Sequence, residues 1–347
     1  MTTARLDLTR SQVLAYRRRV GSLDERLPRN RRSLEKAAWA GLQDSMPRAA
    51  LLSIHARVED TTPDTWDDPA FVQLWGPRYS TYVVAERDIA VFTLGRLSDD
   101  AADRQLARTV AAELRDVLAG STMTDRDAGH ALGRNPNRFR YGAPTGTILI
   151  RWPGAGAPTV WTVAAPDTDP HDARLELTRR YLHVLGPSTP RSFARWAGLP
   201  PQSGVAAFDD LKRTLIPVRT PIGEAWILSG DESEFRTAPA PAFSARFLPS
   251  GDAYWLLQGD DRELLVEDAT HRDELWPSRV WPGALLVGGE IVGTWRRSQN
   301  KLAIDTWRRL TRDEKASVDA EGSTLPIPGI KGAMSISYTY DHQGQPG

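Results

Sequence analysis

The sequence predicts a mixed α+β protein made of three similar helix-and-strand units and a β-rich domain at the end of the chain. Segments with helical periodicity, each followed by β-branched or aromatic segments, recur three times up to about residue 237. After the short stretch TAPAPAF, strand-like segments dominate. The 347 residues are 40% hydrophobic and 25% charged, which is ordinary globular composition and enough length for two or three domains.

The first unit, residues 1–97, combines three expected helices with a strand region. Thr9 and Gln12 form a capping-box pattern that begins a helix through about Val20. Two more helices are expected over residues 34–42 and from about Pro47, whose fixed φ suits a first turn. The segment YSTYVVAERDIAVFTLG is rich in β-branched and aromatic residues, which favours strands. Three helices followed by strands is the order of a winged helix.

The same order of elements recurs in residues 98–166 and 167–237. In the second unit a long helix is expected over residues 106–117, Thr124 can cap a short helix, and TGTILIRW and PTVWTVA are the strands. In the third unit a helix begins at Pro170, STPRSFARWAGL and VAAFDDLKRTL are the next helices, and IPVRT and EAWILS form the hairpin. The sequence therefore predicts three tandem winged-helix units.

The last domain, residues 243–347, is expected to be a small β-barrel or sandwich. Its predicted strands are ARFL, YWLLQ, LLVED, ALLVGGEIVGTW, KLAIDTW and AMSISYTYD. Gly288 and Gly289 lie between two apolar runs, as a two-residue hairpin turn requires. A short helix is expected near residues 312–320.

Composition excludes several kinds of site. The chain has no cysteine, which excludes disulfides, Cys-based zinc sites and thiol catalysis. Its six histidines show no metal-ligand spacing, so we expect neither a metal nor a cofactor. The first thirty residues lack the apolar core of a signal peptide, and no run of about 18 uncharged apolar residues occurs. We therefore expect a cytoplasmic protein that does not enter a membrane.

Arginines cluster locally although the formal net charge is zero. Residues 1–60 contain 12 Arg and Lys against 7 Asp and Glu, and the segment GRNPNRFRYG has three arginines and no acid. Such runs are usually solvated faces, but two of them near turn-like segments favour contacts to nucleic-acid phosphates. The candidate contacts are Arg17, Arg18, Arg19, Arg29, Arg31, Arg32, Arg57, Arg134, Arg138 and Arg140.

Three segments, GLQDSMPRAALLSIHARV, LGPSTPRSFARWAGL and LVGGEIVGTWRR, together resemble the AlkZ and YcaQ family of winged-helix DNA glycosylases, in order along nearly the whole chain. The resemblance implies a C-shaped molecule around duplex DNA and an activity that removes alkylated purines, including cross-linked ones, in DNA repair. That family's catalytic motif is Gln, an apolar residue, then Gln. The matching positions here are Gln43, Asp44 and Ser45, which also depart from a related Gln, apolar, Asp pattern.

These three residues form the candidate catalytic site, and they have a structural alternative. The Gln43 carbonyl can orient a water molecule, Asp44 can take its proton and stabilise positive charge on the sugar, and Ser45 can hold the water from its other side. Alternatively, Asp44 or Ser45 caps the helix that begins near Pro47, because both residue types accept hydrogen bonds from backbone N–H groups of a first turn. The two roles do not exclude each other.

The expected partner is double-stranded, alkylated DNA, and two functions are compatible with it. The first is a monofunctional DNA glycosylase, a hydrolase that acts as a monomer. The alternative is a noncatalytic winged-helix DNA-binding protein, either a damage sensor or a transcriptional regulator. A regulator usually reads paired half-sites as a dimer, and no heptad pattern is visible here. A protein that binds no DNA fits the zero net charge but not the clustered arginines.

Overall fold

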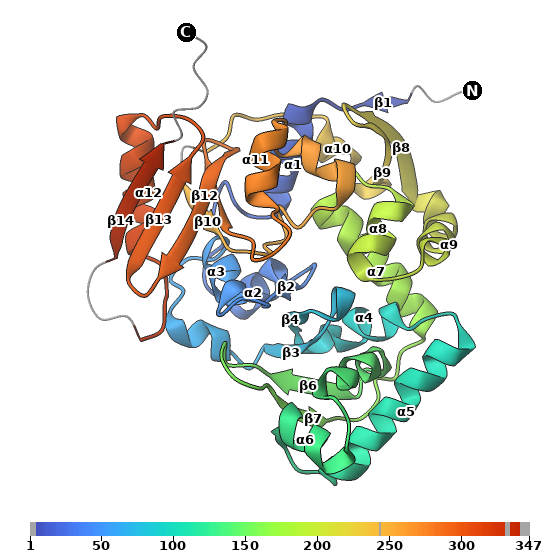
Figure 1. Ribbon diagram of the computed structural model, residues 1–347. Helices are drawn as coiled ribbons and strands as arrows, with labels where there is room; N and C mark the ends of the chain where they lie inside the picture. Colours follow the sequence, from blue (N-terminus) through green and yellow to red (C-terminus); the bar gives the residue numbers. More distant parts are fainter. Residues whose placement is uncertain (1–4, 243, 330–333, 341–347) are drawn as a thin grey trace.

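Helices lie between and around three β-sheets in the computed structural model, which describes residues 5–242, 244–329 and 334–340 (Figure 1). The protein is therefore a mixed α+β structure, as the sequence predicts. The sheets contain three, five and six strands and lie on different sides of the molecule (Figure 1). No helix in these ranges combines the length and the apolar character needed to cross a membrane.

The first and third expected helices are confirmed. α1 (Arg10–Val20) has a complete capping box: the Thr9 side chain accepts a hydrogen bond from the Gln12 backbone, and the Gln12 side chain accepts one from the Thr9 backbone. α3 (Ala49–His55) begins just after Pro47, and all its residues are buried. The capping box therefore works as expected, whereas Pro47 lies just before α3 and not in its first turn.

The second helix is shorter than predicted. α2 (Arg31–Ala37) begins after an Asn30 cap and ends well before residue 42. The chain then turns at Gly41, where φ is +73° and a Cβ atom would lie 2.8 Å from the Phe92 ring. Only glycine fits this turn readily. It leads into a short strand, β2 (Leu42–Gln43), where the sequence predicts the end of a helix.

The largest sheet joins strands from the first and second expected units. In order across the sheet, its strands are β2, β4 (Thr81–Ala85), β3 (Phe71–Trp75), β6 (Ile148–Arg151), β7 (Thr159–Thr162) and β5 (Met123–Thr124). All pairings are antiparallel. The predicted strand region after Tyr79 is only half right, because β4 ends and a helical turn, α4 (Ile89–Phe92), buries Val91 and Phe92 in the core. β3 lies in a segment for which the sequence predicts no element.

The helices of the second unit are confirmed. α5 (Ala101–Leu118) is followed by α6 (Asp125–Leu132), where the Thr124 side chain accepts a hydrogen bond from the Asp127 backbone. A 3₁₀ segment, η5 (Pro136–Thr145), then lies beside α5 and carries Arg138 and Arg140 of the second arginine cluster, while Arg134 lies just before it.

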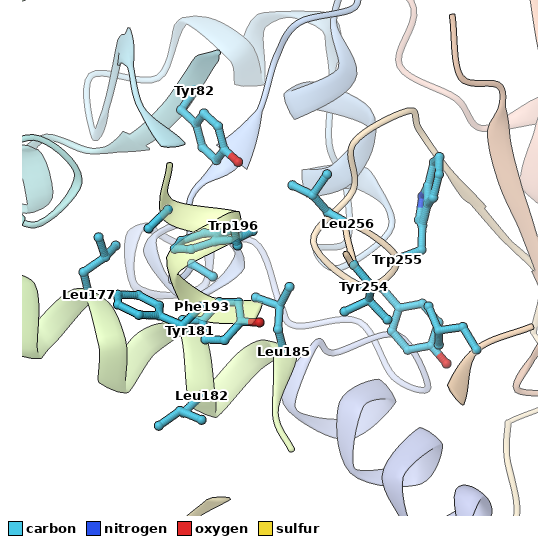
Figure 2. Packing of buried hydrophobic residues seen from close by; sticks show 14 of the residues in the cluster. Tyr82, Leu177, Tyr181, Leu182, Leu185, Phe193, Trp196, Tyr254, Trp255 and Leu256 are labelled. Atoms are coloured by element: carbon cyan, nitrogen blue, oxygen red, sulfur yellow. The ribbon is translucent and has the colours of Figure 1, made fainter. Parts of the chain in front are cut away.

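The helices and hairpin of the third unit are also confirmed. They are α7 (Pro170–Leu185), α8 (Pro190–Ala197), α9 (Pro201–Leu211), β8 (Leu215–Thr220) and β9 (Gly223–Leu228), followed by α10 (Glu232–Phe235). β1 (Leu6–Asp7) extends this hairpin by pairing in parallel with β8. Figure 2 shows Tyr181, Phe193 and Trp196 in the core, where the Tyr181 and Trp196 ring centroids are 5.0 Å apart.

The C-terminal strands form one sheet with two edge strands among the described residues, whereas the sequence predicts a closed barrel or a two-sheet sandwich. In order, the strands are β10 (Arg246–Leu248), β11 (Gly283–Val287), β12 (Glu290–Ser298), β13 (Lys301–Thr306) and β14 (Ser335–Tyr340). The hairpin turn at Gly288 and Gly289 is confirmed, with φ of +58° and +84°. α12 (Arg312–Ser323) and β10 contact each other. The first and last residues of the predicted final strand, Ala333 and Asp341, lie outside the described ranges.

Two predicted strands of this region, YWLLQ and LLVED, are wrong. Residues 254–258 form turns and irregular structure; Leu264 ends a 3₁₀ helix, η8 (Gly259–Leu264), and residues 265–268 are a turn and irregular structure. Short α11 (Ala269–Leu275) follows. Trp255 and Leu256 are nevertheless buried, and they pack in the same core cluster as the third unit (Figure 2). Their hydrophobic run reflects burial between elements rather than membership of a sheet.

A buried ion pair attaches α3 to the segment before η8. The Arg57 guanidinium donates two hydrogen bonds to the Asp252 carboxylate, at 2.6 and 2.7 Å, and a third to the Ser53 carbonyl at 2.8 Å. Asp252 also accepts a hydrogen bond from the Tyr254 backbone. Arg57 and Asp252 are 3% and 1% exposed, so the desolvated charges depend on each other.

We expect Arg57→Met to lower the free energy of unfolding by about 3–5 kcal/mol, because it leaves the Asp252 carboxylate buried without its partner. Urea denaturation measures the change. The matched control is Arg31→Met, which removes an exposed arginine from its pair with Glu35 and should cost less than about 1 kcal/mol. Similar losses in both variants would contradict this account of the ion pair.

Candidate active site

The three predicted catalytic residues lie where β2 ends and the chain turns towards α3. Gln43 is the last residue of β2 and pairs with Tyr82 in β4. The Asp44 backbone N–H donates to the Thr81 carbonyl at 2.8 Å, which extends the attachment to the sheet by one residue. The turn ends at Arg48, whose φ is +64°. The segment is therefore fixed at one end by the sheet and at the other by the helix.

Asp44 is buried and accepts three hydrogen bonds. Its Oδ1 accepts from the Ala50 backbone at 3.0 Å, and its Oδ2 accepts from Gln73 Nε2 at 2.7 Å and from Trp66 Nε1 at 3.3 Å. These bonds and the charge of Arg48 lower the pKa of the carboxyl, but burial outweighs them and raises the pKa to about 6. Ala50 lies in the first turn of α3, so Asp44 binds one backbone N–H of that turn from a distance, although the N-cap position itself is Arg48 and not Asp44 or Ser45.

Gln43 and Ser45 contact each other rather than the helix. Gln43 Nε2 donates to Ser45 Oγ at 3.2 Å, and Gln43 Oε1 accepts from Arg78 Nη2 at 3.1 Å. Because a guanidinium only donates, this contact requires the amide oxygen to face Arg78. Gly251 closes the other side: its φ is +81°, and a Cβ atom there would lie 3.1 Å from Gln43 Cδ. The amide is therefore held in one orientation.

Arg78 is held by an unusual turn between β3 and β4. Arg78 and Tyr79 both have left-handed backbone conformations, with φ of +54° and +56°. Each costs of the order of 1–2 kcal/mol for a residue other than glycine. Gly198, at the end of α8, allows this turn to pack closely, since a Cβ atom there would lie 3.0 Å from the Arg78 nitrogen. Arg78 Nη1 is buried and has no hydrogen-bond partner among the described residues.

Positive charge gathers beside Asp44. The guanidinium carbons of Arg48 and Arg151 lie 3.9 and 3.3 Å from the centroid of the Trp66 ring, within cation–π distance. Arg151 also forms an ion pair with Asp67. Burial and the neighbouring charge of Arg48 lower the pKa of Arg151. The buried carboxylate therefore lies close to two positive side chains. The same positive charge would attract an anionic ligand.

Sequence reasoning missed the residues that surround the motif. These are Arg48, Trp66, Gln73, Arg78 and Arg151. Gln73 gave a signal, since it is the one polar residue of the apolar strand FVQLW. Arg78 follows Gly and Pro in a turn, a position where sequence alone does not reveal a left-handed conformation.

Three of the candidate phosphate contacts are wrong, because their guanidinium groups are buried and bind other groups of the protein. Arg17 is 1% exposed and donates to two carbonyls at the C-terminal end of α7, at 3.0 and 2.7 Å. Burial lowers the pKa of Arg17. Arg18 is buried and pairs with Asp24 at 2.9 Å. Arg57 is buried in its pair with Asp252.

The other seven candidates keep access to solvent. They are Arg19, Arg29, Arg31, Arg32, Arg134, Arg138 and Arg140. The second cluster is partly neutralised, since Glu113 of α5 lies 3.7 Å from Arg134 and 3.6 Å from Arg138. The local sequence contains no acid, so only the packing of η5 on α5 reveals this pairing. Contact of the seven with DNA stays a prediction.

The chain is similar to known DNA glycosylases in sequence and in fold. A family model described as DNA glycosylase AlkZ-like matches residues 37–325. A curated relative, the interstrand DNA cross-link repair glycosylase of Streptomyces sahachiroi, is 24% identical over 188 residues, which are 51% of this chain and 50% of that protein. The chain thus spans about half the length of this relative. The solved structure of Streptomyces sahachiroi DNA glycosylase AlkZ has the same fold: the TM-score is 0.76 at 16% identity, covering 97% of this chain and 100% of that one.

The raised pKa of Asp44 predicts a pH-dependent stability. The carboxyl binds a proton more tightly in the folded protein (pKa about 6) than in the unfolded chain, whose ordinary value is 3.8. Its stabilising contribution is therefore present below about pH 4 and is lost as the pH rises through about 6, a change of about 3 kcal/mol. Urea unfolding of the wild type and Asp44→Asn between pH 4 and 8 should show a difference that changes by this amount. A difference that is constant with pH would contradict the assignment.

Proposed function

The chain belongs to the AlkZ-like DNA glycosylase family, and from this premise we propose that it is a monofunctional glycosylase that hydrolyses the N-glycosidic bond of alkylated purines in duplex DNA. The observation that carries the proposal is the Gln43 amide, which is fixed between Arg78 and Ser45 and directly precedes the buried Asp44 in the chain. Such an arrangement suits a reaction that depends on the position of one water molecule.

The chemistry requires little from a leaving-group acid. Alkylation at a ring nitrogen gives the purine a positive charge, so the base departs readily once the sugar carbon begins to bear positive charge. The protein must then place a water molecule and stabilise that charge. Gln43 Oε1 uses one lone pair for Arg78 and keeps one for a water hydrogen. This reaction needs no metal and no cofactor.

Asp44 has two roles in the proposal. A carboxylate has about four acceptor sites, and three of those of Asp44 are occupied by N–H donors. The remaining site can accept the proton of the attacking water, while the fixed negative charge stabilises the oxocarbenium-like sugar. With a pKa of about 6, the group is mainly ionised at neutral pH. Arg78 acts as a positioning residue, because it sets which end of the Gln43 amide faces the sugar.

The alternative function is noncatalytic DNA binding by a damage sensor or regulator. It is supported by Ser45 at the position of the family's second glutamine and by the engagement of Asp44 with the first turn of α3. The two functions differ in whether an alkylated base leaves the DNA.

The proposal extends to the architecture and the setting. We take residues 1–97, 98–166 and 167–237 as tandem winged-helix units and residues 243–347 as the C-terminal β domain. The repeated helix order and the three hairpins β3–β4, β6–β7 and β8–β9 support this division. In this proposal the protein acts as a cytoplasmic monomer on double-stranded DNA.

Incubation with a duplex that carries a single N7-methylguanine should produce abasic sites, which alkali converts into strand breaks. Gln43→Ala should lower the rate by at least about 100-fold, because a positioned polar group contributes mainly in the transition state. Its DNA affinity and melting temperature should remain near those of the wild type. The matched control is Gln105→Ala, on the exposed face of α5, which should keep the full rate.

Asp44→Asn separates catalysis from capping in the same assay. A base contributes about two to four decades in rate, whereas a residue that only caps contributes stability and leaves the rate per folded molecule nearly unchanged. If the wild type binds the duplex tightly and releases no base, the noncatalytic function replaces the enzyme.

DNA affinity should fall steeply with salt if the exposed arginines contact phosphates. The log–log slope is about −0.9 for each phosphate neutralised. Replacing Arg29, Arg31 and Arg32 together by Gln should make the slope shallower by about 0.9 for each phosphate that is no longer neutralised. Fluorescence anisotropy of a labelled duplex between 50 and about 300 mM salt measures it. A DNA affinity that does not change with salt would rule out an interface based on phosphate contacts. If the triple variant has the same slope as the wild type, Arg29, Arg31 and Arg32 do not contact phosphates and other residues must do so.

A further inference from the structure

A groove of about 310 Å³ lies next to the candidate active site and is not used by the proposed hydrolysis. Its floor is apolar, with side chains from α3 and the turn before it, from the loop before β11 and from β12; they include Met46, Leu52, Val280, Trp281 and Trp295. Met46 is 38% exposed and Val280 is 57% exposed, which places both among the few large apolar side chains of the described chain that face solvent. Such a surface beside a reaction centre is typical of a ligand site.

The edge of the groove is positive. Arg296 and Arg297 of β12 line it, and both are exposed. Their hydrogen bonds go to backbone carbonyls: Arg296 donates to Val280 at 3.4 Å and Arg297 to Gln299 at 2.9 Å. Neither forms an ion pair with a described residue, and no acidic side chain lines the groove. A ligand with apolar faces and a negative group complements this surface.

The groove is continuous with the candidate catalytic segment. Met46 and Pro47 directly follow Ser45 in the chain. Ser250 also lines the groove, and the next residue is Gly251, which packs against the Gln43 side chain. Two segments of the groove wall are therefore joined directly to the candidate catalytic segment or to its neighbour Gly251.

We propose that the groove holds one unstacked nucleotide of the bound DNA, with its base on the apolar floor and its phosphate at Arg296 and Arg297. The inference rests on the proposed function, since it takes DNA as the ligand. A nucleotide joins a flat, largely apolar base to a negative phosphate, which matches the two parts of the groove. Stacking on Trp281 and coverage of Met46 and Val280 remove apolar surface from water.

The experiment uses duplexes with 2-aminopurine, whose fluorescence rises when it leaves the stack. A stable tetrahydrofuran abasic analogue marks the site, and 2-aminopurine stands in turn on its 5′ side, on its 3′ side and opposite it. Binding of the wild type should raise the fluorescence at one of these positions. No rise at any position overturns the proposal, whether or not the DNA is bound.

Variants assign the rise to the groove. Val280→Asp places a carboxylate at an exposed position of the groove, so the fluorescence rise should disappear and binding should weaken by about 5- to 100-fold, the value of one stacked base. The double variant Arg296→Gln, Arg297→Gln should also reduce the fluorescence rise and weaken DNA binding, and it does so without introducing a negative charge. The matched control is Val205→Asp on α9, 50% exposed, which should behave as the wild type. A rise that persists in both groove variants overturns the proposal.

Release of N7-methylguanine, measured in parallel, separates this inference from the proposed function. Base release without a fluorescence rise overturns the groove and leaves the glycosylase standing. A rise that depends on Val280 without base release supports the groove and overturns the glycosylase.

Discussion

The buried carboxylate of Asp44 is the contact on which the rest of the site depends. Its backbone N–H attaches it to β4, its Oδ1 to the first turn of α3, and its Oδ2 to Gln73 of β3 and to Trp66. One residue thus joins a sheet, a helix and a loop. Burial makes its charge costly, and the three donors with the nearby arginines lower that cost without removing it. These contacts also fix the backbone of the neighbouring Gln43. The hydrogen bond from Arg78 then determines the direction of the Gln43 amide.

Local signals in the sequence predict much of the fold. The capping box at Thr9, the Thr124 cap and the Gly288–Gly289 turn all form as expected, because each depends on a few adjacent residues. The errors occur where distant contacts decide the structure. Residues 254–257 are apolar because they fill a core between elements, and the turn at Gly41 that follows α2 lies against Phe92, which is distant in the sequence.

The arginines show the same limit at the site. Sequence patterns identify Gln43, Asp44 and Ser45 and identify arginine-rich segments, but they do not show which guanidiniums are buried. Arg17 binds the end of α7, an element more than 150 residues away along the chain, and Arg57 binds Asp252. Conversely, Arg78 gains its role from a left-handed turn that brings it to Gln43. The number of arginines in the sequence therefore overestimates how many positive side chains are exposed for contact with DNA.

Asp44 is a buried carboxyl with a raised pKa that accepts a hydrogen bond from the first turn of α3. ¹³C NMR of protein labelled at the aspartate carboxyl measures this directly, with Asp44→Asn to assign the resonance. The account predicts that the Asp44 signal titrates with a pKa of about 6. A pKa at or below the ordinary value of 3.8 would show that the three hydrogen bonds outweigh burial, and it would contradict the account.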